Sequence, residues 1–183
     1  IGASSGDAFE GHFDGDGHVI KGMYIDNNYT FSNSNQGGKG TCVGLFGYLN
    51  DAVVSDVILE DSLILANGHV TYAGSVAGRA LASEVRKCTS EAAMKGAMAD
   101  HLGGVLGQSL STETKDNVVE MSTVYGNTFA GVINFTNALP EKTAYIGGVI
   151  GYAQGNIANC TNRGSILVQG ETNDYIGGIT GEF

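Results

Sequence analysis

The chain has 183 residues and a mass of 18.9 kDa; 42% of its residues are hydrophobic, 29 are glycine, one is proline and none is tryptophan. This length fits one domain with its own core, which we expect to comprise residues 1–183. The glycines have no three-residue period, which excludes collagen. Nineteen acidic and nine basic side chains give a formal net charge of −10. Because lysine and arginine form no cluster, we expect no nucleic-acid partner.

A short glycine motif recurs five times and indicates an internal repeat. The copies, in chain order, are Gly44-Leu-Phe-Gly47, Ser75-Val-Ala-Gly78, Gly104-Val-Leu-Gly107, Gly148-Val-Ile-Gly151 and Gly178-Ile-Thr-Gly181. Their closing glycines are 31, 29, 44 and 30 residues apart. This spacing predicts a structural unit of ~30 residues with one enlarged copy.

Two apolar elements follow each of the first four glycine motifs. The second element of the repeat is Val54 and Val57, Val85 and Cys88, Val118 and Met121, and Ile157 and Cys160. The third element is centred on Ile64, Met94, Ile133 and Ile166. Before the first motif we assign an earlier copy, with Phe13-Asp-Gly15 near the glycine element, Ile20 and Met23 as the second element and Tyr29–Phe31 as the third.

The apolar segments have ~4–6 residues, are bounded by Gly, Asn, Asp or Ser, and lack a helical period, which predicts short strands. A unit of this size cannot enclose a core alone, whereas stacked units pair equivalent strands in parallel. We therefore predict an all-β fold, a right-handed parallel β-helix-like solenoid of about five turns of ~30 residues with three short strands each. The extra residues of the enlarged copy are expected in three loops, at 108–115, 122–129 and 137–143.

The glycine motif and the opening segment resemble a known family. Gly44-Leu45-Phe46-Gly47 and its weaker copies look like the GLUG motif of bacterial surface proteins, and residues 9–25 are similar to the stretch that often precedes GLUG repeats. The resemblance implies a β-solenoid within large secreted or cell-surface proteins, including adhesin-like proteins and the non-catalytic part of some immunoglobulin-cleaving metalloproteases. It implies no catalytic residues. We expect the sequence to be a segment of a longer protein.

The cysteines are predicted to be buried thiols. Cys88 and Cys160 occupy the same repeat position, in an inner column with Met23, Val57 and Met121. Two turns of ~4.8 Å would separate them, beyond the reach of a disulfide. Cys42 is assigned to a position whose other members are apolar. These are Ala73, Leu102, Ile146 and Ile176.

Motifs for catalysis or for metal binding are absent from the sequence. The histidines lack a zinc-binding spacing, Asp14-Gly-Asp16 lacks the remaining ligands of a calcium loop, and no phosphate-binding glycine loop occurs. We therefore expect no cofactor and no metal. Carboxylate neighbours such as Glu60 with Asp61, or Asp100 with Glu120, leave a glycan-cleaving enzyme as an alternative.

One surface position repeats with aromatic side chains. Six residues before the closing glycines stand Thr41, Tyr72, His101, Tyr145 and Tyr175. A solenoid stacks such positions ~4.8 Å apart. The last four are the candidate ligand-binding residues, because flat rings with a polar edge can hold a sugar or an aromatic side chain, with Asp100 and Asp174 as neighbouring acceptors. The alternative is cross-strand stacking that only stiffens the sheet.

These features lead to one main functional hypothesis. We expect a non-enzymatic structural or adhesin-like module of a bacterial extracellular or cell-surface protein, a rigid stalk that binds host or matrix glycans or surface proteins. The alternatives are a carbohydrate-active β-helix enzyme, either a polysaccharide lyase or a glycoside hydrolase, and an accessory domain of a surface metalloprotease. The apolar stretches are too short for a membrane span in this segment.

Overall fold

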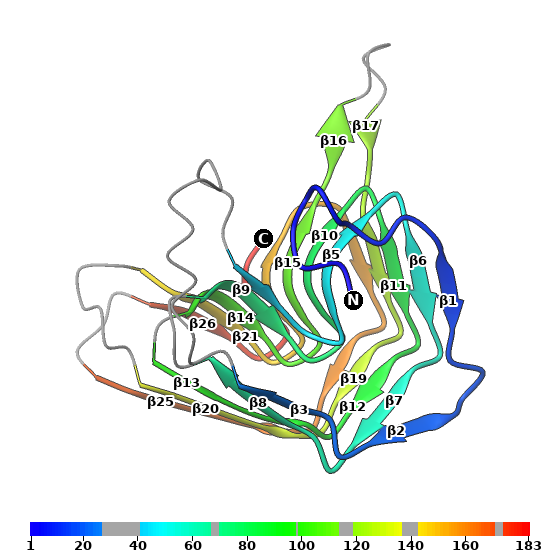
Figure 1. Ribbon diagram of the computed structural model, residues 1–183. Coiled ribbons are helices and arrows are strands. Elements are labelled where there is room, and N and C mark those ends of the chain that lie inside the picture. The colour runs from blue at the N-terminus through cyan, green and yellow to red at the C-terminus, as the bar shows by residue number, and fades with distance from the viewer. Residues whose placement is uncertain (27–40, 67–69, 98, 114–118, 137–142, 171–173) are drawn as a thin grey trace.

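The computed structural model describes residues 1–26, 41–66, 70–97, 99–113, 119–136, 143–170 and 174–183. The regular secondary structure in these ranges consists of strands. They form five parallel sheets of five strands each and one short antiparallel hairpin. The chain passes through the five sheets in a fixed order and then returns to the first, so it winds as a solenoid of five stacked turns (Figure 1).

Each sheet takes one strand from every turn, and we number the sheets in the order in which the chain meets them. The first sheet contains β1 (His12–Asp14), β6 (Val53–Ser55), β11 (Glu84–Arg86), β18 (Thr123–Tyr125) and β23 (Asn156–Ala158). The second contains β2 (Val19–Lys21), β7 (Ile58–Glu60), β12 (Thr89–Ser90), β19 (Thr128–Phe129) and β24 (Thr161–Asn162). The third contains β3 (Tyr24–Asp26), β8 (Leu63–Ala66), β13 (Ala93–Gly96), β20 (Val132–Thr136) and β25 (Ser165–Gln169).

The last two sheets flank the glycine motifs. The fourth sheet contains β4 (Cys42–Val43), β9 (Val70–Gly74), β14 (Ala99–Gly103), β21 (Tyr145–Gly147) and β26 (Tyr175–Gly177). The fifth contains β5 (Phe46–Asn50), β10 (Ala77–Leu81), β15 (Leu106–Leu110), β22 (Ile150–Ala153) and β27 (Thr180–Glu182). The predicted parallel β-solenoid is confirmed, with five strands in a turn where the sequence indicated three segments.

Left-handed corner residues explain the additional strands. Between the first and second sheets, all five turns have positive φ: the first turn at Asp16 (49°) and Gly17 (68°), and the later turns at Asp56 (55°), Lys87 (53°), Gly126 (66°) and Asn159 (53°). One such residue redirects the chain sharply, and Gly, Asn and Asp adopt this conformation more readily than other residues. The apolar stretch from Val53 to Leu59, which reads as one segment in the sequence, is therefore divided into β6 and β7.

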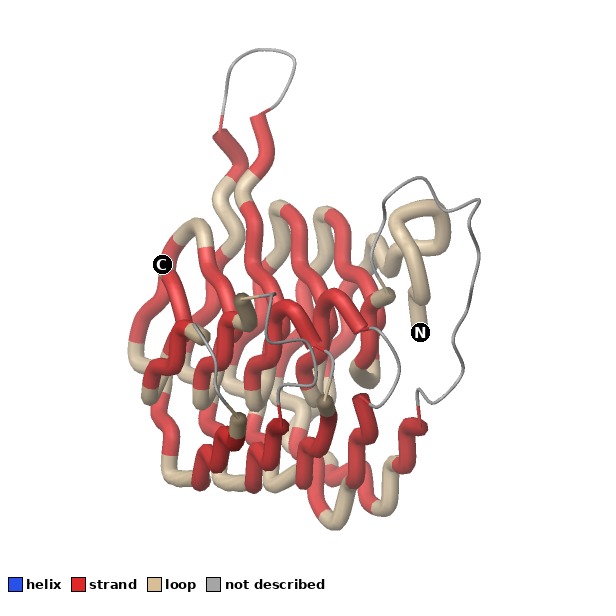
Figure 2. Tube along the Cα trace, turned by 90° about the vertical axis from the view of Figure 1, so that its left-hand side faces the viewer, coloured by secondary structure: helices blue, strands red, loops and turns tan. Residues whose placement is uncertain are grey.

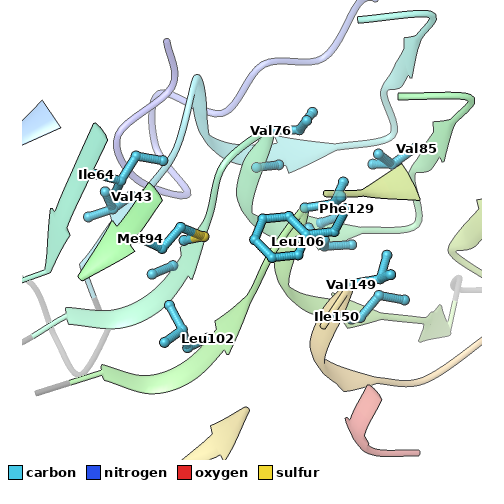
Figure 3. Packing of buried hydrophobic residues seen from close by; sticks show 14 of the residues in the cluster. Val43, Ile64, Val76, Val85, Met94, Leu102, Leu106, Phe129, Val149 and Ile150 are labelled. Atoms are coloured by element: carbon cyan, nitrogen blue, oxygen red, sulfur yellow. The ribbon is translucent and has the colours of Figure 1, made fainter. Parts of the chain in front are cut away.

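The interior is a column of apolar side chains from successive turns. The third repeat element lies in register as predicted, with Ile64 paired to Met94, Met94 to Ile133 and Ile133 to Ile166. Ile64, Met94 and Ile133 are at most 1% exposed. Figure 3 shows Ile64 and Met94 in the same buried cluster as Leu106 of the fifth sheet and Val149 of a glycine bend.

The sequence assignment of the second element is wrong in the enlarged copy. Val124, not Val118, pairs with Val85. In the inner column Asn127 follows Cys88. The Thr128 amide donates to the Cys88 carbonyl, just as the Thr89 amide donates to the Val57 carbonyl one turn earlier, so Asn127 is the counterpart of Cys88. Met121 is 49% exposed, and Val118 lies outside the described residues. Val57, Cys88 and Cys160 do lie in one column, as expected.

The assignment of the first turn is also wrong. Phe13, not Ile20, pairs with Val54 as the second element. Ile25 pairs with Ile64 as the third element, and Met23 therefore lies outside the inner column. The predicted third element, Tyr29–Phe31, lies outside the described residues.

The enlarged copy has one principal insertion among the described residues. Leu110 and Thr123 are thirteen positions apart, whereas their partners Leu81 and Glu84 are three apart. The additional residues include β16 (Thr112–Glu113) and β17 (Val119–Glu120), an antiparallel hairpin that projects from the coil (Figures 1 and 2). The expected insertion within 122–129 is absent, because this stretch pairs with the preceding turn without extra residues. Most of 137–143 lies outside the described residues.

The glycine motifs form the bend between the fourth and fifth sheets. A Cβ atom on Gly74 would overlap the carbonyl oxygen of Ala77 across the bend. A Cβ on Gly78 would lie only 2.7 Å from the backbone nitrogen of Val43 and 2.8 Å from the Gly47 oxygen. Glycine thus permits both the reversal and the close approach of the two sheets. Side chains that flank the bend consequently face each other.

The N-terminal segment lies along the outer edge of β5. The Gly47 amide donates to the Ile1 carbonyl at 2.7 Å, and the Phe9 amide donates to the Tyr48 carbonyl at 3.0 Å. The Phe9 ring packs 5.0 Å from the Phe46 ring. This segment thereby satisfies backbone groups of the terminal strand.

Candidate functional site

The four predicted aromatic residues stack along the fourth sheet, and we call them the aromatic ladder. His101 pairs with Tyr72 and with Tyr145, and Tyr145 pairs with Tyr175. Successive ring centroids are 5.1, 5.0 and 5.3 Å apart, with interplanar angles of 34°, 23° and 13°. The structure therefore brings these residues together in the predicted geometry.

The first turn departs from the predicted ladder. Cys42, not Thr41, pairs with Tyr72, and Val43 pairs with Ala73 in the apolar position that the sequence assigned to Cys42. The reason is that the bend of the first turn is one residue shorter, since Phe46 pairs with Ala77. Cys42 is nevertheless buried, and the three cysteines form no disulfide with one another.

A second ladder on the fifth sheet faces the first, and sequence analysis missed it. Its members share one position, immediately after the closing glycines, and we call them the mixed ladder. They are Tyr48, Arg79, Gln108, Tyr152 and Glu182. The glycine motif identifies this position in the sequence, but its side chains share no chemical type, so no pattern distinguished it.

The two ladders contact each other across the glycine bend. The Arg79 guanidinium lies 4.9 Å from the centre of the Tyr72 ring. The Gln108 Nε2 atom lies 3.4 Å from His101 Nε2. The Tyr152 ring packs edge-on against His101 at 5.6 Å. We call the combined surface of the aromatic and mixed ladders the two-ladder face.

Burial sets the ionisation of the two-ladder face. Desolvation lowers the pKa of His101 and raises the pKa of Tyr72. It also raises the pKa of the Cys42 thiol to about 12. At neutral pH these three side chains are therefore uncharged. Exposure increases toward the last turn, where Tyr175 is 52% exposed.

The two aspartates predicted beside the aromatic ladder have different surroundings. Asp174 Oδ1 accepts a hydrogen bond from the Ala144 amide at 2.9 Å, which ties the start of β26 to the turn before it. Asp100 lies on β14 next to His101, where its charge opposes the lowering of the His101 pKa. The Asp174 carboxylate therefore has a structural role.

The other candidate groups lie away from the two-ladder face. Glu60 and Asp61 flank Lys21, with N–O distances of 2.7 and 4.0 Å. Asp100 lies on the fourth sheet, whereas Glu120 lies on the projecting hairpin. Across the described ranges, no group of three or more His, Cys, Asp and Glu side chains is arranged to hold a metal ion.

Comparison with known proteins locates one repeat. Residues 143–167, from the approach to β21 into β25, match the family model described as the GLUG motif. The chain contains a GLUG motif. This motif is found in bacterial extracellular proteins. The matched residues include Tyr145 of the aromatic ladder and Tyr152 of the mixed ladder, so the GLUG repeat contributes one rung to each.

Comparisons with the curated proteins and with the solved structures found no match. In the described part of the chain, no helix has the length and apolar character needed to cross a membrane.

Proposed function

We propose that the chain is a non-enzymatic, rigid module of a bacterial extracellular or cell-surface protein, and that its two-ladder face binds glycans in an adhesin-like role. One observation carries the proposal: five parallel turns in register align Tyr72, His101, Tyr145 and Tyr175 into one continuous row of rings. Because the rings stack on one another, the row presents their edges, where apolar ring C–H groups alternate with hydroxyl and imidazole groups that can contact the C–H and hydroxyl groups of sugars. The GLUG motif supports the extracellular setting.

The rigidity follows from the backbone pairing. Every turn is hydrogen-bonded to its neighbours through five separate sheets, and the interior is close-packed with aliphatic side chains. Bending the coil would break ladder bonds on one side and open the core on another. The binding residues are therefore held on a scaffold that keeps their spacing.

A glycan array tests the proposal with matched variants. We expect the wild type to bind a subset of glycans, and we expect Tyr145→Ala and Tyr175→Ala to lose that binding. Tyr24→Ala is the control, because Tyr24 is 62% exposed on the third sheet. Identical profiles for all four proteins would remove the aromatic ladder from the proposal. Shortened glycan products after incubation would instead support the enzyme alternative.

A further inference from the structure

The mixed ladder contains a cation without a carboxylate partner. The Arg79 guanidinium contacts two rings, at 5.2 Å from the centre of Tyr48 and 4.9 Å from that of Tyr72. In the described residues, no carboxylate forms an ion pair with Arg79, whereas Arg86 pairs with Glu84 at 2.8 Å. Its Nε atom is buried and has no hydrogen-bond partner. The two rings orient the guanidinium and leave its charge unneutralised.

The neighbouring rung contains an acceptor without a donor. Gln108 is 7% exposed. The His101 Nδ1 atom lies 3.3 Å from the Thr71 carbonyl oxygen, which can only accept, so Nδ1 carries the proton. The His101 Nε2 atom therefore accepts from the Gln108 amide group at 3.4 Å. This arrangement orients the amide and leaves the Gln108 Oε1 atom buried without a partner.

Unpaired buried donors and acceptors are costly, and in native proteins a ligand or an ordered water usually satisfies them. Arg79 and Gln108 are adjacent in register on β10 and β15. The guanidinium can bind an anion, the Gln108 oxygen can accept a hydrogen bond from a hydroxyl group, and the edges of the adjoining rings can pack against apolar C–H groups. A sugar residue that carries both a carboxylate and hydroxyl groups supplies all three.

We infer that the two-ladder face recognises acidic glycans built of uronic acids, with Arg79 contacting the carboxylate and Gln108 contacting a sugar hydroxyl. This inference rests on the proposed glycan-binding function and adds the class of ligand. The formal net charge of −10 repels polyanions at long range. Binding of an acidic glycan therefore reflects this local site rather than general electrostatic attraction.

Calorimetric titration with two forms of one glycan tests the inference. The probes are an oligogalacturonate and its fully methyl-esterified form, which retains the rings and hydroxyl groups but has no charge. We expect the wild type to bind the acid form about ten-fold more tightly than the ester. Arg79→Met should lose that preference and retain the affinity for the ester. Gln108→Met should weaken binding of both forms.

Arg163→Met is the matched control, because Arg163 is exposed and lies outside both ladders. Equal wild-type affinity for acid and ester would overturn the inference without any variant, and so would an unchanged preference in a folded Arg79→Met protein. Binding of neutral glycans alone, abolished by Tyr145→Ala, would leave the proposed function standing and refute the acidic ligand. Binding of no glycan would refute both.

Discussion

The amide group of Asn127 bonds to the backbone of the preceding turn at two points, Val85 and Cys88, and Cys88 is the counterpart of Asn127 in that turn. Its Oδ1 atom accepts the Cys88 amide at 2.8 Å, and its Nδ2 atom donates to the Val85 carbonyl at 2.8 Å. Asn127 is fully buried, so water does not compete for these bonds. A polar side chain in the inner column thus joins two turns at a corner where the ladder of backbone bonds is interrupted.

Replacing Asn127 with alanine should lower the free energy of unfolding by about 2–4 kcal/mol, because two buried backbone groups would lose their partners. Urea denaturation measures this change. Asn156→Ala is the control, since Asn156 is exposed on β23; its effect should stay within about 0.5 kcal/mol. A loss of similar size in both variants would show that the buried amide has no special role.

Two glycines in the same motif position should differ sharply in their tolerance of a methyl group. A Cβ on Gly104 would overlap the Phe129 ring, whereas a Cβ on Gly178 would have nothing within 4 Å. We expect Gly104→Ala to cost about 3 kcal/mol through overpacking and Gly178→Ala to be close to neutral. Thermal melts of the two variants compare them directly. Equal melting temperatures would contradict the steric explanation.

The natural sequence already contains a test of this contact. Ser75 occupies the equivalent position one turn before Gly104, and its hydroxyl donates to the Gly104 carbonyl at 2.5 Å. On the second sheet, Ser90 takes the place that Phe129 takes in the following turn. A small residue on that sheet leaves room for the serine side chain, and the phenylalanine ring does not.

The sequence was sufficient where a repeat position keeps one chemical character. The third element was predicted in register because Ile64, Met94, Ile133 and Ile166 are all aliphatic or thioether side chains. The aromatic ladder was predicted for the same reason. Periodicity identifies such positions directly.

The sequence was insufficient where the chemistry changes from turn to turn. Asn127 breaks the apolar pattern of the inner column, so the apolar pair Val118 and Met121 was chosen in its place, and an insertion was predicted within 122–129, where the structure has none. The mixed ladder was missed because Arg79 and Gln108 become candidate site residues only through their contacts with Tyr72 and His101 across the bend. Neither relationship is present in local sequence.

Lys87 is an unfavourable residue for its corner. Its φ is 53°, and three of the other turns have Asp56, Gly126 and Asn159 at this position. Lys87 is exposed, so glycine can replace it without loss of packing. We expect Lys87→Gly to raise the free energy of unfolding by about 1 kcal/mol, since it relieves left-handed strain of ~1–2 kcal/mol at a smaller entropic cost. Asn159→Gly should change the free energy of unfolding by less. A larger gain for Asn159→Gly than for Lys87→Gly in urea denaturation would refute this account.

His101 should make folding sensitive to mild acid. Burial lowers its pKa below 6.5, mainly by desolvation, while the neighbouring Asp100 and Glu182 charges partly oppose this effect. The unfolded chain therefore takes up a proton near pH 6.5 that the folded chain resists, and stability should be unaffected at pH 8 but should decline as the pH falls below about 6.5. His101→Tyr retains a ring in the ladder and removes this titration. Between pH 8 and pH 5.5 the urea midpoint should fall further for the wild type than for His101→Tyr. Equal declines in the two proteins would show that carboxylates alone account for the pH dependence.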